Sequence, residues 1–123
     1  MQRASRPVFL DFARIRFPVG AVASAGHRIS GVLLLCALPL AAWALQRSLG
    51  GEDSFRSLVA SLRSVPGRAL LVIVAWACAH HVLAGVRHLL TDVGVGSSLA
   101  SARRSAYGVI AAALLVAAAA ALA

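Results

Sequence analysis

The sequence has no lysine and few acidic residues, and charged residues fill only 13% of its 123 positions. Hydrophobic residues make up 60%, and the mean hydropathy is +0.85, outside the range of soluble globular domains. The two cysteines, Cys36 and Cys78, lie inside apolar runs without C-x-x-C spacing, so we interpret them as small apolar residues. These scarcities exclude a soluble domain and indicate an integral membrane protein.

The positive charge comes from arginine alone. The formal net charge of +8 reflects 12 arginines against four acids, Asp11, Glu52, Asp53 and Asp92. Because the arginines flank apolar runs, we attribute them to membrane orientation, and we expect no nucleic-acid binding. The amino-terminal segment meets Asp11 and several arginines before any long apolar run, so it lacks the pattern of a cleavable signal peptide.

Three apolar runs are long enough to cross a membrane, which takes roughly 20 residues for a helix. We expect spans over 22–46, 67–92 and 103–123, after a surface segment over 1–18. The loop between the first two spans contains apolar residues at helical spacing, which indicates a short surface helix. The sequence therefore predicts an all-α integral membrane protein, a single membrane-anchor domain with three transmembrane helices and no internal repeat.

Arginine asymmetry predicts the orientation of these spans. Four arginines lie on one side, at positions 47, 56, 63 and 68. Eight belong to the amino-terminal segment, the second loop and the adjoining helix ends: Arg3, Arg6, Arg14, Arg16, Arg28, Arg87, Arg103 and Arg104. Because arginine-rich segments stay in the cytoplasm, we expect a cytoplasmic amino terminus.

Histidines in the second span are the main functional signal, because ionisable groups inside a membrane are costly to bury. His81, Gly85 and His88 are spaced at i, i+4 and i+7 and share one helix face. Gly85 leaves a notch in which a large planar group such as a haem can pack beside a metal-binding imidazole. The alternative is a polar packing seam, in which the histidines hydrogen-bond to neighbouring helices.

A low-spin haem needs two axial ligands on opposite faces of the iron. His81 and His88 lie about 10 Å apart along one helix, and His80 points about 100° away from His81, so no two of them bind one iron. The second ligand must come from His27 in the first span or from another chain. Haem propionates favour cations near the membrane boundary, where four candidates lie: His27, Arg28, Arg87 and His88.

A quinone is the second ligand that this boundary suits. Arg28 and Ser24 are i, i+4 neighbours on one helix face, from which they can donate hydrogen bonds to a quinone carbonyl. Asp92 lies at the same boundary as a counter-ion or proton acceptor. The spacing alone favours neither the propionate use nor the quinone use.

Two separated stretches carry a resemblance to a known family. The first contains Arg6-Pro7-Val8, Ile15-Arg16-Phe17-Pro18 and Ser24-x-x-His27-Arg28-x-Ser30-Gly31, and the second is His81-x-x-x-Gly85-Val86-Arg87-His88-Leu89-x-x-Asp92-x-Gly94. Together they resemble the cytochrome b subunit of succinate dehydrogenase, the larger of the two membrane anchors of respiratory complex II. Thr91 and Ala25-Gly26 depart from the residues usual in the family, which bears on the shape of the quinone pocket.

The resemblance implies roles for individual residues. His81 would be an axial ligand of haem b, with the opposite ligand supplied by the smaller membrane anchor subunit. Ser24 and Arg28 would bind ubiquinone or menaquinone, with Asp92 near that pocket, while His27 and Arg28 would meet the haem propionates. No residue of this chain would be catalytic, because succinate is oxidised in another chain.

The function that the resemblance implies is a haem b-binding membrane anchor of succinate:quinone oxidoreductase in a bacterial inner membrane. Its helical bundle would be completed by the sister anchor, surrounded by membrane lipid, and would tether the flavoprotein and iron–sulfur subunits. Two alternatives remain, the anchor of a quinol:fumarate reductase and a haem-free structural membrane subunit. A small-solute transporter is disfavoured, because the chain lacks a repeat and paired interrupted helices.

Overall fold

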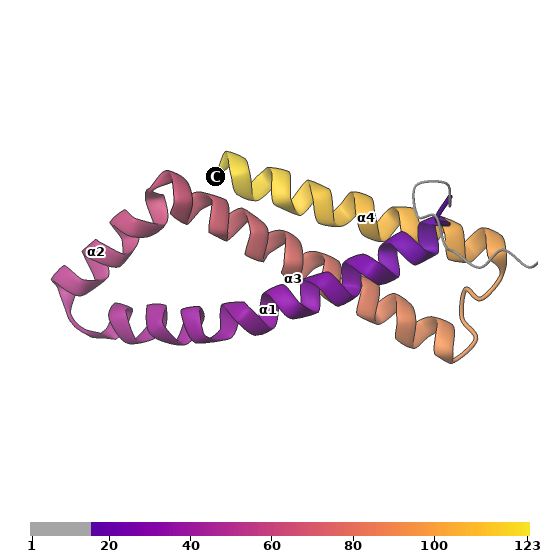
Figure 1. The fold of residues 1–123 in the computed structure, drawn as a ribbon, viewed down its shortest axis with the longest axis horizontal. Helices are drawn as coiled ribbons and strands as arrows, with labels where there is room; N and C mark the ends of the chain where they lie inside the picture. Colours follow the sequence, from indigo (N-terminus) through magenta and orange to yellow (C-terminus); the bar gives the residue numbers. More distant parts are fainter. Residues whose placement is uncertain (1–15) are drawn as a thin grey trace, which may run out of the picture.

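The computed structural model describes residues 16–123. Within that range the regular structure is entirely helical, and the chain runs as α1 (Val19–Leu49), α2 (Glu52–Arg63), α3 (Val65–Asp92) and α4 (Leu99–Leu122) (Figure 1). The helix expected between the first two spans is α2. Most of the expected surface segment over 1–18 lies outside the described residues.

Helices α1, α3 and α4 are long and apolar enough to cross a membrane. They contain 31, 28 and 24 residues, and each includes an 18-residue window whose mean hydropathy is 1.9, 2.0 and 2.1, respectively. At 1.5 Å per residue, α3 is about 42 Å long and exceeds a hydrocarbon core of about 30 Å, so its ends reach the headgroup region. The predicted all-α membrane fold with three spanning helices is confirmed.

A tight corner joins α2 to α3. The Ser64 hydroxyl accepts a hydrogen bond from the Gly67 main-chain nitrogen at 3.3 Å and caps α3, with Pro66 in the first turn. A methyl group at Gly67 would overlap the Ser61 carbonyl oxygen and the Leu62 Cα atom. Glycine at this position therefore lets the two helix backbones approach each other closely.

Small residues fill the contacts between the spanning helices. α3 packs along α4 and crosses α1, and it runs antiparallel to both helices (Figure 1). The side chains buried between them are mainly alanine, at positions 23, 77, 84, 106 and 113. Leucines and valines stay exposed over most of the helix surfaces, which suits a lipid environment in which close packing drives helix association.

Arg87 holds the end of α3 against the start of α4. Its Nε atom donates to the Ser105 hydroxyl at 3.0 Å, and its Nη2 atom donates to the Ala102 carbonyl oxygen at 3.2 Å. The connecting turn uses Gly94 and Gly96 at φ angles of 84° and 72°, which favour glycine. The second loop is therefore a defined turn braced by a charged side chain.

Candidate functional site

Three histidine rings from two helices gather where α1 crosses α3. The ring of His27 on α1 stacks on that of His81 on α3, with 4.3 Å between centroids and 18° between planes. The ring of His88 lies 5.2 Å from His27 and is tilted by 51°. All three side chains are half-buried, so the crossing forms a polar cluster inside an apolar molecule.

The His81 ring is oriented through one nitrogen only. Its Nδ1 atom lies 3.2 Å from the His27 carbonyl oxygen and 3.4 Å from the Ser30 hydroxyl oxygen. Because a carbonyl oxygen only accepts, Nδ1 carries the hydrogen and Nε2 keeps its lone pair. No hydrogen bond involving Nε2 is found among residues 16–123, so this atom is available as a metal ligand.

The neighbouring His80 is engaged in a different way. It is only 3% exposed, its Nε2 donates to the Ala23 carbonyl oxygen at 3.1 Å, and its ring stacks on Trp76 at 5.4 Å. Gly26 makes room for it, since a methyl group there would lie 2.5 Å from His80 Nε2. His80 therefore forms the polar packing seam that was the alternative to a cofactor, a contact that the sequence did not assign.

Beside His81 the two helices diverge and leave an apolar cleft. The cleft has a volume of about 520 Å³ and a lining of apolar and small residues from both helices, among them Gly31 and Leu34 of α1 and Val74 and Cys78 of α3. A methyl group at Gly31 would lie 3.2 Å from His81 Cε1, so glycine keeps this edge of the ring clear. Gly31 thus lies both in the lining of the cleft and against the His81 ring, although His81 itself is not among the lining residues.

The space beside Gly85 differs from the notch expected there. A methyl group at Gly85 would meet His27 Nε2 at 3.4 Å, so an imidazole of the same chain already faces the glycine. The two axial ligands of one iron point at each other through the metal, whereas His27 and His81 lie face to face. His27 is therefore not opposed to His81 in this chain, and a second ligand from another chain stays a prediction.

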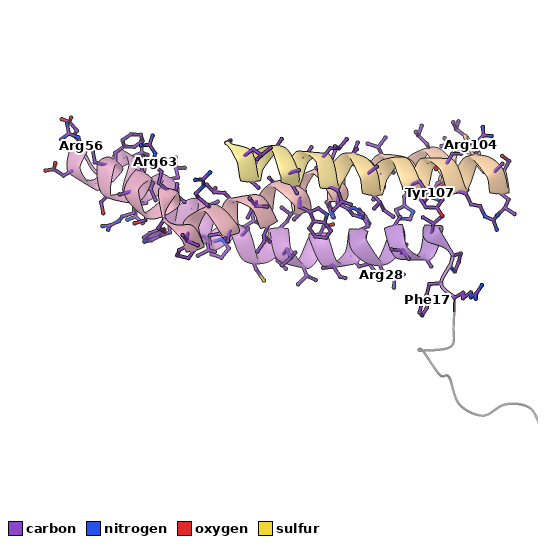
Figure 2. The ribbon with its side chains drawn as sticks, turned by 90° about the horizontal axis from the view of Figure 1, so that it is seen from above. Phe17, Arg28, Arg56, Arg63, Arg104 and Tyr107 are labelled. Carbon is purple, nitrogen blue, oxygen red and sulfur yellow. The ribbon has the colours of Figure 1, made fainter. Side chains whose placement is uncertain are left out.

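The three predicted quinone residues lie apart from this histidine cluster. Arg28 is exposed on the side of α1 that faces away from α3 and α4 (Figure 2), and Ser24 lies one turn earlier. Asp92 is the exposed last residue of α3. Among the described residues no hydrogen bond or ion pair joins any two of the three, so this chain alone does not bring them together.

Arg87 and Ser30 also differ from the expectations. Arg87, considered as a propionate partner, has its guanidinium engaged with α4. Ser30 received no role from the sequence, yet it is fully buried and contacts His81. The available signal was its place in the first of the two family-like stretches, three residues after His27.

Comparisons with known proteins support the sequence resemblance. A profile of the family described as succinate dehydrogenase/fumarate reductase transmembrane subunit matches residues 2–120. The chain is 40% identical over 107 residues to the succinate dehydrogenase cytochrome b556 subunit of Coxiella burnetii, covering 86% of each chain. It is 31% identical over 117 residues to the subunit of the same name from Paracoccus denitrificans, covering 95% of this chain and 90% of that one.

A third relative, the succinate dehydrogenase cytochrome b556 subunit of Rickettsia felis, is 25% identical over 111 residues, which is 90% of this chain and 86% of the relative. The match of the family profile spans nearly the whole chain, including both stretches that contribute to the histidine cluster. The apolar spanning helices agree with a transmembrane subunit. The chain therefore belongs to the succinate dehydrogenase/fumarate reductase transmembrane subunit family, as a membrane anchor of the cytochrome b type.

Proposed function

We propose that this chain binds haem b through His81 Nε2 and is the larger anchor subunit of a succinate:quinone oxidoreductase. The observation that carries the proposal is the hydrogen-bonding of the His81 ring, whose Nδ1 donates to the main chain of α1 and leaves Nε2 free. A ligating histidine is held in this way in metal sites, by a hydrogen bond at the nitrogen remote from the metal. Haem bound there supplies a one-electron carrier inside the membrane.

The residues around His81 fit such a group. The apolar cleft beside Gly31 suits the hydrophobic edge of a macrocycle. His27 and the exposed guanidinium of Arg28 lie nearer the arginine-rich end of the bundle, where propionates would find cations. The names of the Coxiella and Paracoccus relatives, cytochrome b556 subunits, support a haem in this subunit type. The smaller anchor subunit would supply the second ligand of such a haem.

The quinone site is built on the outer face of α1. Arg28 is charged, lies about 14 Å along α1 from its first residue, and has no partner among the described residues. Such a cation needs a polar partner near the membrane boundary. Ser24 and Arg28 donate to a carbonyl oxygen of ubiquinone or menaquinone, and Asp92 faces the same pocket once the partner subunits close it.

The partner subunits dock on the end of the bundle that carries Arg28. Figure 2 shows Arg28, Arg104 and Tyr107 near one end and Arg56 and Arg63 near the other. The arginine excess of the first end favours a cytoplasmic location in a bacterial inner membrane, with the amino terminus on that side. The iron–sulfur subunit and the flavoprotein, where succinate is oxidised, are tethered there.

The haem assignment is tested on the purified complex by its reduced absorption spectrum. We expect a b-type α band that is lost in His81→Ala and retained in His80→Gln, because glutamine keeps a donor for the Ala23 carbonyl oxygen. A complex without stoichiometric haem would overturn the assignment and favour a haem-free structural anchor. Retention of the band in His81→Ala would place the ligand elsewhere.

The quinone assignment is tested separately by steady-state kinetics. Arg28→Leu should slow quinone reduction at least tenfold, while succinate oxidation with an artificial electron acceptor stays unchanged. The matched control is Arg104→Leu, which removes an exposed arginine near the same end of the bundle. Equal quinone kinetics in Arg28→Leu and the wild type would remove Arg28 from the site.

A further inference from the structure

We infer that Ser30 is a positioning residue for His81, and that its hydroxyl, together with the His27 carbonyl oxygen, sets the reduction potential of the haem iron. This inference rests on the proposed function. It adds a residue that acts through the imidazole rather than by touching the cofactor. It also gives a physical reason for a buried hydroxyl group inside a membrane helix.

The contacts form a closed triangle of three polar groups. The Ser30 hydroxyl donates to the His27 carbonyl oxygen at 2.9 Å, and the same hydroxyl oxygen lies 3.4 Å from His81 Nδ1. Nδ1 in turn lies 3.2 Å from the His27 carbonyl oxygen. Since the hydroxyl hydrogen is used on the carbonyl, the hydroxyl lone pairs face the Nδ1 hydrogen, which is shared between two acceptors.

Burial makes this triangle rigid. Ser30 is fully buried, so water does not compete for its hydroxyl group. The ring of His27 covers one face of the His81 imidazole, and Gly31 lies against the Cε1 edge. A single α1 segment, residues 27–31, therefore contacts the nitrogen, the face and the edge of the same ring.

A second serine of α1, Ser48, makes the same kind of hydrogen bond to the main chain and therefore serves as a comparison for Ser30. Ser48 donates to the carbonyl oxygen three residues earlier, at 2.7 Å, but it is only half-buried and no contact with a histidine is found among the described residues. A bond of this type is a common local feature of helices. What distinguishes Ser30 is its second contact, across the helix crossing, with a candidate metal ligand.

The electronic consequence has a defined sign. Acceptors on the Nδ1 hydrogen draw it from the ring, which makes Nε2 a stronger electron donor and stabilises ferric over ferrous iron. Removal of the Ser30 hydroxyl leaves Nδ1 with the His27 carbonyl alone. We therefore expect the midpoint potential of the haem to rise in Ser30→Ala, and the ring to lose part of its fixed orientation.

The test is redox titration and low-temperature electron paramagnetic resonance of the purified complex. Ser30→Ala should keep haem at wild-type stoichiometry, raise its midpoint potential and shift or broaden its low-spin ferric signal. Ser48→Ala, the matched control, should leave both measurements unchanged. Ser30→Thr, which retains a hydroxyl group, should restore the wild-type potential. If Ser30→Ala or Ser30→Thr assembles poorly, Ser30→Cys, a side chain of similar size with a weaker acceptor, should show a smaller rise.

Each outcome bears on one claim. An unchanged potential and an unchanged ferric signal in Ser30→Ala would overturn the role of Ser30 while leaving His81 as the ligand. A rise in Ser48→Ala equal to that in Ser30→Ala would also overturn it, because the effect would then belong to helix packing. A wild-type complex without haem, or with haem that His81→Ala retains, would instead refute the proposed function on which the inference rests.

Discussion

Gly26 offers a direct test of the contact between α1 and α3. In Gly26→Ala the new methyl carbon would lie 2.5 Å from His80 Nε2 and 3.0 Å from its Cε1 atom. The ring cannot simply rotate away, because His80 is only 3% exposed, stacks on Trp76 and donates to the Ala23 carbonyl oxygen. The helices must therefore separate, or the ring must give up its hydrogen bond.

Three contributions set the expected change in the free energy of unfolding, two of them destabilising and one stabilising. Overpacking of a well-filled contact costs about 1–3 kcal/mol. We take the upper part of that range because the new methyl group would overlap the His80 ring, which is held on several sides. Loss of the hydrogen bond within a membrane protein adds about 0.6 kcal/mol. Alanine in place of glycine inside a helix returns about 1 kcal/mol. We therefore expect Gly26→Ala to lower the free energy of unfolding by about 2 kcal/mol.

The assay is unfolding of the purified complex in mixed micelles by a denaturing detergent, with Gly108→Ala as the control. No atom lies within 4 Å of a methyl group built at Gly108, so that variant should be neutral or more stable by up to about 1 kcal/mol. In a His80→Ala background the Gly26→Ala change should cost nothing. The reasoning fails if Gly26→Ala is as stable as the wild type, or if its cost persists without the His80 ring.

Three further substitutions test the remaining helix junctions in the same unfolding assay. Gly67→Ala should destabilise the protein by about 3 kcal/mol or prevent assembly, because the new methyl group would overlap main-chain atoms of α2. Wild-type stability in this variant would refute the close approach of α2 and α3. Arg87→Met should lower the free energy of unfolding by about 1–3 kcal/mol. Ser105→Ala should cost less than half of that, because the Ala102 carbonyl oxygen still accepts a hydrogen bond from Arg87 in this variant. Equal losses in the two variants would contradict the expected difference.

The spacing of apolar residues predicted the short helix between the first two spans, and hydropathy predicted the number of spanning helices. It could do so because membrane thickness sets the length of an apolar run, and this signal is local in the chain. The approach of His27 to His81 was not predictable in the same way. α1 and α3 are apolar on nearly every face, so their sequences do not indicate how far each helix is rotated about its axis.

The different engagement of His80 and His81 illustrates what the sequence lacked. Helix geometry predicts that the two rings point about 100° apart. It does not predict which ring nitrogen of each lies near an α1 carbonyl oxygen, because that depends on where the two helices cross. At that crossing, small residues of α1, Ala23 and Gly26, lie against the His80 ring of α3. Their fit is a property of two surfaces together, which neither segment encodes alone.

The dependence of His81 on α1 has a consequence for biogenesis. Before α1 and α3 dock, nothing fixes the tautomer of this imidazole, and either ring nitrogen can carry the hydrogen. Docking supplies the acceptors at Nδ1, so a nitrogen ready for iron arises only after the helices have met in the correct register. On the proposed function, cofactor capture would then act as a checkpoint on newly inserted copies, separating well-folded anchors from those that proteases remove.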